Sequence, residues 1–261
     1  MKPNQLTTFA IAALLIAVAV LTVTAWQTLR HPISESSNYR LDASKIIVPE
    51  QPRWVSDNIV EESLQNAGLD HDGSILDRRM PERLATALLA HPWVAEVQSV
   101  RLVYPNGAEV KLTYREPAAM VELNGGLLPV DKNGVLLRTD YFRSIAPEAA
   151  NKFPRITGTI NPPLGTVGTS WGDEKVEAAA YVAGVLQNLP PESGLQSILT
   201  ENETITLQTK SGKNLIWGKV KPSKEPTPED ITKREKLEQI IKLYNNLDNV
   251  PQTQLNDLLR Q

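Results

Sequence analysis

Two short stretches of the chain place a histidine beside groups that could do chemistry. Asp70-His71-Asp72-Gly73 sets carboxylates on both sides of an imidazole, as a metal or acid–base cluster would. An EF-hand loop would need further oxygen ligands and a later glutamate, and a zinc site would need ligands from elsewhere, but the sequence supplies neither. We therefore interpret this stretch as a polar turn after a helix.

The second stretch is His91-Pro92-Trp93. A histidine titrates near neutral pH and could act as a general base, but catalysis also needs a nucleophile or a second carboxylate. The sequence has no Gly-x-Ser-x-Gly elbow to supply one. At a helix end, a histidine cation meets the negative end of the helix dipole and can donate to free carbonyls. We expect this capping role for His91 and a core position for Trp93.

Other polar stretches have equally simple explanations. Residues 165–170 are rich in glycine and hydroxyls but lack the Lys-Ser/Thr ending of a phosphate-binding loop, so a surface turn is expected. Residues 233–236 mix both signs, which is typical of a solvated helix face. Arg115-Glu116 stands at the end of an expected strand, where it would hold a domain junction. Cysteine is absent, which excludes disulfides and thiolate zinc sites. The sequence thus predicts no catalytic residue, no metal site and no cofactor.

The composition limits the class of partner. A chain of 261 residues is long enough for two domains, each with a core of its own. The formal net charge is −3 and no long run of one sign occurs, so nothing favours binding to nucleic acid. No motif predicts a small-molecule substrate.

The N-terminal region contains an uncharged run, LTTFAIAALLIAVAVLTVTAW, at residues 6–26. A helix needs about 20 such residues to cross a bilayer core. We predict a membrane anchor here, after a cytoplasmic tail of residues 1–5 and before a linker of residues 27–40. A removable signal peptide, cleaved after Val23-Thr24-Ala25, is the alternative. Both interpretations predict that the rest of the chain lies outside the cytoplasm.

The part after the linker predicts the order strand, helix, helix, strand, strand. A strand is expected at residues 39–48, then a helix capped by Ser56 and ended by Gly68, then a helix that starts near Pro81. Asn106-Gly107 marks a hairpin turn before a strand in which apolar residues alternate with polar ones. The alternating apolar residues are Ala108, Val110, Leu112 and Tyr114.

The remainder predicts a β-rich region with flanking helices. One hairpin is expected across residues 131–134 and another across Ser211-Gly212. Asp173 and Thr227 are expected to cap two helices, the second of them amphipathic. The fold class predicted for the whole chain is α+β.

Several motifs, in this order, resemble the FtsQ/DivIB family of bacterial cell-division proteins. The stretches that carry the resemblance are HPWV at 91–94, VRLVYPNG at 100–107, REPAA at 115–119, LPVDKNGVL at 128–136 and GKNLIWG at 212–218, followed by a Lys-rich helix at 233–247. Each motif is weak alone, and their order makes the resemblance more specific.

The resemblance implies a single-pass inner-membrane protein at the division site, with its N-terminus inside. It implies a POTRA domain at residues 41–117, an FtsQ-like β domain at 118–247 and a polar tail at 248–261. Family members catalyse no reaction; they recruit septal membrane proteins and regulate wall synthesis. Partners similar to FtsB and FtsL are implied, with a binding strand transferred to Asn214, Leu215, Ile216, Trp217, Gly218, Lys219 and Val220. The family commonly has another strand after the final helix, whereas here Asp257-Leu258-Leu259-Arg260 closes the sequence.

Two other functions stay open at this point. A POTRA-bearing adaptor for protein transport or envelope assembly would use similar domains, usually in tandem and with a membrane β-barrel. An exported hydrolase would require His91 to lie exposed beside a carboxylate and a nucleophile.

Overall fold

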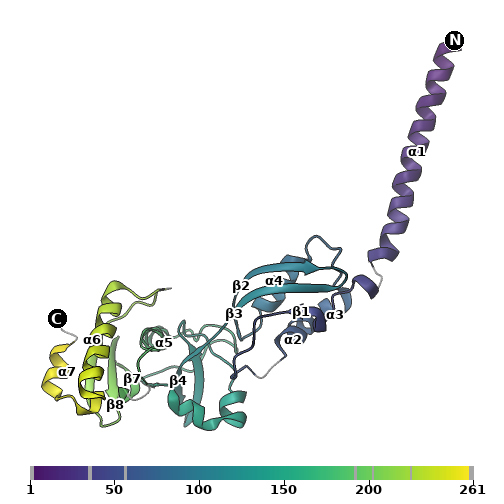
Figure 1. Cartoon of the computed structure of the whole chain (residues 1–261). Coiled ribbons are helices and arrows are strands. Elements are labelled where there is room, and N and C mark those ends of the chain that lie inside the picture. The colour runs from purple at the N-terminus through teal and green to yellow at the C-terminus, as the bar shows by residue number, and fades with distance from the viewer. Residues whose placement is uncertain are drawn as a thin grey trace. The chain divides into compact units, whose positions relative to one another are not determined.

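The computed structural model describes residues 3–34, 37–55, 58–190, 193–201, 203–223 and 225–258, without the side chains of 3–10, 28–37 and 256–258. The chain divides into two compact units (Figure 1). The first comprises Met1–Pro49, Asn58–Leu88 and Val97–Leu112, and the second comprises Glu50–Asp57, Leu89–Glu96 and Thr113–Gln261. Both units combine helices with sheets, so the predicted α+β class is confirmed.

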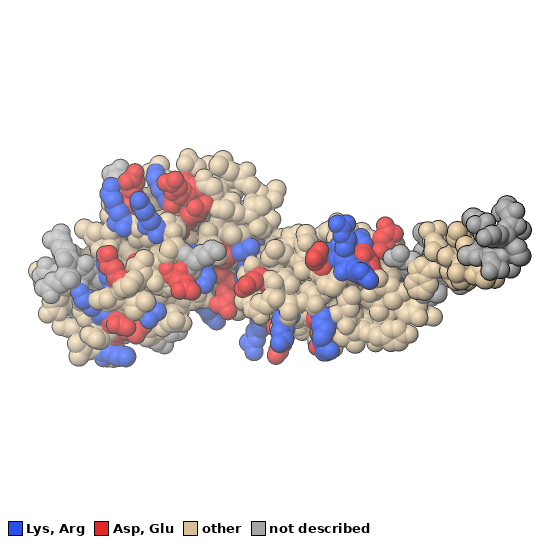
Figure 2. All heavy atoms as spheres, turned by 90° about the horizontal axis from the view of Figure 1, so that it is seen from above, with Lys and Arg blue, Asp and Glu red and all other residues tan. Residues whose placement is uncertain are grey.

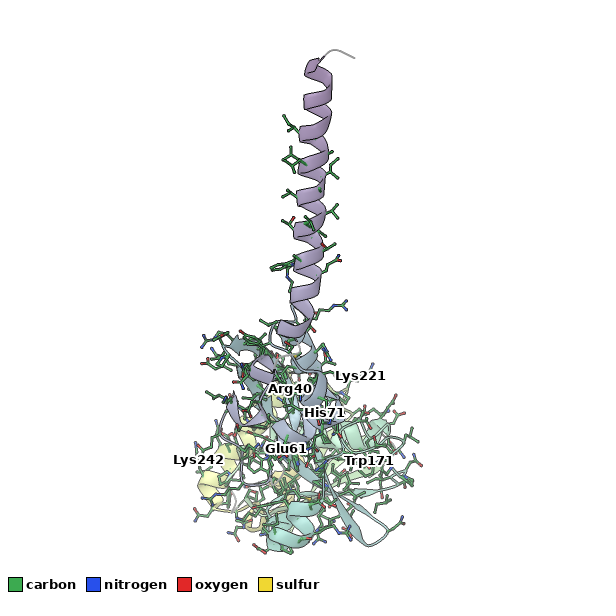
Figure 3. All side chains as sticks on the ribbon, turned by 90° about the vertical axis from the view of Figure 1, so that its right-hand side faces the viewer. Arg40, Glu61, His71, Trp171, Lys221 and Lys242 are labelled. Carbon is green, nitrogen blue, oxygen red and sulfur yellow. The ribbon has the colours of Figure 1, made fainter. Side chains whose placement is uncertain are left out.

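The chain begins with a long helix, α1 (Pro3–Ser34). Its described apolar side chains, among them Leu14, Leu21 and Trp26, are exposed. Figure 3 shows side chains projecting on both sides of the α1 ribbon. Over the residues that the structure describes, no helix is both long and apolar enough to cross a membrane. The predicted span 6–26 lies within α1, and the structure does not describe the side chains of its first five residues.

The first unit is built on a three-stranded sheet with the order β1-β3-β2. Strand β1 pairs with β3 in parallel, and β2 and β3 run side by side as a hairpin (Figure 1). Its helices and strands are β1 (Ile46–Ile47), α2 (Ile59–Asn66), α3 (Leu69–Asp72), α4 (Met80–Leu89), β2 (Val94–Val103) and β3 (Gly107–Tyr114). The core comes from buried residues of α2 and α4 and from the alternating residues of β3, whose alternation the sequence predicts.

In this unit, hydrogen bonds from backbone amides to nearby side chains give a shorter first strand and a different helix cap from those predicted. The strand predicted at 39–48 is only two residues long, because Asp42 accepts a hydrogen bond from the Ser44 amide and starts a 3-10 turn at Ala43–Lys45. The N-cap of α2 is Asn58, whose side chain accepts from the Glu61 amide, while Ser56 lies outside the described residues. Gly68 follows α2 in the left-handed region, with φ 65°, as predicted.

The second unit is built on a six-stranded mixed sheet with the order β5-β4-β6-β7-β8-β9. Its strands are β4 (Pro117–Leu123), β5 (Gly126–Asp131), β6 (Arg155–Gly158), β7 (Leu195–Glu201), β8 (Thr204–Thr209) and β9 (Asn214–Gly218). Its α-helices are α5 (Glu174–Val185), α6 (Pro228–Tyr244) and α7 (Gln252–Leu258). A π-helical turn, Tyr141–Ile145, and 3-10 turns at Pro147–Lys152 and Leu247–Asn249 complete it.

One face of this sheet carries the main core. Ile198, Leu207 and Leu215 of three neighbouring strands point into it, together with buried residues of α5 and α6. The other face is covered at β4 by Phe142 and its neighbours, packed around Met120. Both predicted helix caps are present: the Asp173 side chain accepts from the Lys175 amide, and Thr227 forms a capping box with Asp230.

Candidate functional site

The strand predicted to bind a partner is the terminal strand of the larger sheet. Strand β9 pairs with β8 on one side, and its side chains alternate between the two faces of the sheet. Leu215 is fully buried and Trp217 is 1% exposed, whereas Ile216 between them is 52% exposed. Asn214 and Lys219 are exposed, and Gly218 and Val220 are half-buried. A partner could therefore touch Ile216 and Lys219, but not the two core side chains.

The outer edge of β9 is partly occupied by the chain itself. The carbonyl of Asn214 accepts a 2.9 Å hydrogen bond from Nε2 of Gln252, the first residue of α7. The carbonyl of Trp217 accepts a 2.8 Å bond from Nζ of Lys233 on α6. Residues 248–261, expected to form a polar tail, thus include a helix that reaches this edge. The residues 259–261 lie outside the described part of the chain.

Lys233 is held at this edge by three groups. Besides the Trp217 carbonyl, its ammonium lies 5.4 Å from the centroid of the Trp217 ring and 2.7 Å from Glu229. The lysine side chain is only 14% exposed, so these contacts are largely shielded from water. The residues 233–236, predicted to be an ordinary solvated face, therefore include a cation that fixes α6 to the sheet.

A buried hydrogen-bond network lies at the N-terminus of α6. Oδ2 of Asp230 accepts from the Tyr181 hydroxyl at 2.7 Å and from the Thr227 hydroxyl at 2.6 Å. Burial raises the pKa of the Asp230 carboxyl, but these hydrogen bonds outweigh it and hold the pKa below its usual value. Burial raises the pKa of Tyr181. The network stabilises the helix terminus.

A second set of bonds attaches the turn at Leu247–Asn249 to the β8–β9 hairpin. Asp248 Oδ1 accepts from both the amide and the hydroxyl of Ser211. Lys213 donates to the carbonyls of Asp248 and Val250. Burial raises the pKa of Asp248, and the Ser211 hydroxyl lowers it, with a net shift downward. These bonds bring α7 back to β9.

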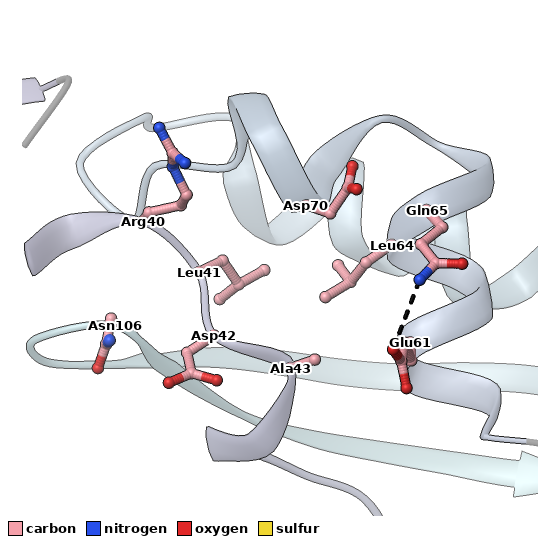
Figure 4. A pocket seen from close by; sticks show the side chains of 9 residues that line it. All are labelled: Arg40, Leu41, Asp42, Ala43, Glu61, Leu64, Gln65, Asp70 and Asn106. Atoms are coloured by element: carbon pink, nitrogen blue, oxygen red, sulfur yellow. Dashed lines mark hydrogen bonds between the residues drawn. The ribbon is translucent and has the colours of Figure 1, made fainter. Parts of the chain in front are cut away.

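The Asp70-His71 stretch borders a cavity of about 360 Å³ in the first unit (Figure 4). Leu41 and Leu64 point toward each other across it. The carboxylates at its rim are engaged locally: Gln65 donates to Glu61, and Asp70 lies 3.2 Å from His71. Among the residues that the structure describes, no group of three or more His, Cys, Asp or Glu could hold a metal ion. His71, labelled in Figure 3, has a largely exposed side chain, but it lies in the short helix α3 rather than in the polar turn that the sequence predicts.

His91 lies two residues beyond the end of α4 and accepts a hydrogen bond through its ring. The side chain is buried, and its Nδ1 accepts a 3.2 Å hydrogen bond from the Trp93 amide. An accepting Nδ1 carries no proton, so the predicted role of a cation donating to free carbonyls is wrong for this nitrogen. Trp93 is buried as predicted. A buried His91 also lacks the exposed position that the hydrolase hypothesis requires.

Arg115 belongs to the second unit and forms its most buried ion pair among those described. Its Nη1 lies 2.7 Å from Asp131, and the two side chains are 15% and 5% exposed. Asp131 also accepts from the amides of Asn133 and Val135, which shapes the turn after β5. The Arg115 carbonyl accepts from the indole of Trp54. A cavity of about 710 Å³ beside the pair is lined by both signs of charge, including Glu96, Glu116 and Lys132.

The surface charges favour no single class of charged ligand. Figure 2 shows Lys and Arg interleaved with Asp and Glu over the described surface in that view. The Gly-rich stretch 165–170 forms a turn in which the Gly168 amide donates to the Leu136 carbonyl. Its backbone is thus used within the fold, as expected for a surface turn.

Comparison with known proteins gives a partial similarity. No family model matches the chain. A cell division protein FtsQ from Anaeromyxobacter sp. (strain K) is 35% identical over 105 residues. The matched residues are 40% of this chain and 31% of that protein, so the chain spans under a third of the length of the relative that it matches. The chain is therefore similar, over part of its length, to a protein named for cell division.

Proposed function

We propose that the chain is a non-enzymatic scaffold of the cell-division machinery, anchored in the inner membrane and recruiting or regulating septal wall-synthesis proteins. The partial similarity to FtsQ is the observation that carries this proposal. The buried state of His91 and the local engagement of the Asp70-His71 stretch support a binding role rather than catalysis.

In this proposal, α1 anchors the chain, with residues 1–5 inside and the rest of the chain outside the cytoplasm. The uncharged run at 6–26 supports it, as do the exposed apolar side chains of α1. The hydroxyls of Thr22 and Thr24 donate to carbonyls of the same helix, Ala19 and Val20, each at 2.9 Å. Such bonds reduce the cost of placing polar groups in hydrocarbon.

The domain assignments are part of the same proposal. Residues 41–117 would form a POTRA domain, since the strand, helix, helix, strand, strand order occurs there with one extra helical turn, α3. Residues 118–247 would form the FtsQ-like β domain. Partners similar to FtsB and FtsL would add an extended segment to a sheet edge, where backbone bonds give affinity and alternate side chains give specificity.

Purification of the full-length protein from membranes, after cross-linking in dividing cells, tests this proposal. We expect septal wall-synthesis proteins and small coiled-coil membrane proteins to co-purify. Co-purification of secretion or outer-membrane assembly components, without septal proteins, would favour the adaptor function instead. A matched purification of a variant lacking residues 1–34 separates partners bound in the membrane from those bound outside it.

A further inference from the structure

A pair of aromatic rings, one exposed and one half-buried, lies at one end of the three-stranded sheet. Tyr104, in the turn between β2 and β3, is 73% exposed, and its ring centroid lies 5.9 Å from that of Tyr39. The Tyr39 backbone is fixed to the same unit, because its carbonyl accepts a 2.9 Å bond from the Ile75 amide. Val103, which precedes Tyr104, and Leu76, which follows Ile75, are also exposed. We call Tyr39 and Tyr104 the tyrosine pair.

The chain tethers this pair close to the proposed anchor. Helix α1 continues eight residues past Trp26, from 27 to 34, a rise of about 12 Å at 1.5 Å per residue. Five more residues lead to Tyr39 and span at most about 18 Å when extended. A group held at such short reach meets the bilayer surface at high effective concentration, even when its intrinsic affinity is weak.

The chemistry of the pair suits the interface between hydrocarbon and water. Tyrosine has an apolar ring and a polar hydroxyl, and it is enriched where lipid headgroups begin. Three cations of this unit lie next to carboxylates, whereas Arg40, beside Tyr39, is exposed. Lys45 lies 3.7 Å from Asp42, Arg83 lies 3.2 Å from Asp77, and Arg101 pairs with Glu109. Because these three cations are paired, we expect the aromatic rings rather than a basic cluster to be the main feature that meets lipid.

We propose that the tyrosine pair rests in the headgroup region of the same bilayer in which α1 is anchored, and binds zwitterionic lipid as well as anionic lipid. This inference rests on the proposed anchoring by α1. It adds a second contact with the membrane, made by the folded unit itself.

Because the chain has no cysteine, a single label can test the contact in the full-length protein. Val103→Cys, beside the intact pair, would carry an environment-sensitive fluorophore after reconstitution into phosphatidylcholine vesicles with a headgroup-level quencher lipid. Leu164→Cys, 82% exposed in the second unit, is the matched control. We expect the label at 103 to be quenched several-fold more than the label at 164.

Substitutions of Tyr104 test whether the tyrosine pair causes the quenching. Added to Val103→Cys, Tyr104→Ser should reduce quenching to the level of the control, and Tyr104→Trp should preserve it. Quenching equal at the two positions, insensitive to Tyr104→Ser, or present only with phosphatidylglycerol would overturn the inference. Flotation of the protein with the vesicles tests the membrane anchor separately. A protein that floats without quenching refutes only the tyrosine contact, and one that does not float refutes the anchor as well.

Discussion

The two sheets end in strands that differ in how far the chain itself covers them. Strand β2 ends the smaller sheet, and every residue from 95 to 103 is at least partly exposed. Strand β9 ends the larger sheet, but α6 and α7 supply side chains that bind its outer carbonyls. A terminal strand therefore offers its edge only where no other element returns to it. If partners dock by strand addition, we expect β2 to accept one directly and β9 only after Gln252 or Lys233 moves.

The strongest test of this contrast is the packing of β9. Trp217→Ala removes a buried ring and should lower the free energy of unfolding of the second unit by about 3–5 kcal/mol. Ile216→Ala, on the opposite face of the same strand, should cost under about 1 kcal/mol. Urea unfolding of the full-length protein in detergent measures both variants. Equal losses would show that β9 is not anchored through its core face.

The next test compares a buried with an exposed ion pair. Arg115→Ala leaves Asp131 buried and unpaired, which should cost about 3 kcal/mol in the second unit. Arg101→Ala breaks the pair with Glu109 in the smaller sheet, where both side chains are well exposed, and should cost at most about 1 kcal/mol. Unfolding curves in detergent give both values, and a larger effect for Arg101 would contradict the burial of the first pair.

Acid should weaken the second unit through Asp230. Its folded pKa lies below the usual 3.8, so its stabilising effect is complete above that value and is lost as pH falls below it. Asp230→Asn should lower stability at neutral pH by about 2 kcal/mol, because it loses hydrogen bonds to a charged group. The thermal midpoint of that variant should then fall less steeply in acid. A decline as steep as in the unchanged protein would assign the acid effect to other groups.

The smallest expected effect concerns the edge of β9. Lys233→Met removes the donor to the Trp217 carbonyl and should cost about 1–2 kcal/mol. Amide hydrogen exchange should quicken in peptides covering β9 and stay unchanged in those covering β2. Lys242→Met, on the exposed side of α6, is the control. If exchange in β9 is unchanged, the lysine does not close this edge.

Local signals in the sequence predicted much of this fold. Thr227 and Asp173 act as caps as predicted, because a hydroxyl or carboxylate before an apolar period has few alternative roles. The alternation at 108–114 predicts the buried face of β3, since the side-chain period of a strand is two. The hairpin across Ser211-Gly212 is likewise present.

Interactions between distant residues were not predictable in this way. Strand β4 begins at Pro117, directly after the strand end expected at Arg115-Glu116, and its hairpin with β5 turns at Asn124-Gly125. It pairs in parallel with β6, which also pairs with β7, and no local pattern encodes such contacts.

The candidate site shows the same limit. The motif at 212–218 located β9 correctly as a strand, yet the closing of its edge depends on Lys233 and Gln252. Those residues lie 16 and 38 positions away from their acceptors. Similarly, the acceptor role of His91 depends on the backbone geometry around Pro92 rather than on residue type.

We propose that the protein works at the division plane by binding. Time-lapse imaging of a fluorescent fusion of the full-length chain, expressed at native level and combined with depletion, tests it most directly. We predict that the fusion gathers at the division plane before constriction and that depletion yields undivided cells. Uniform labelling of the envelope, with normal division after depletion, would contradict the account.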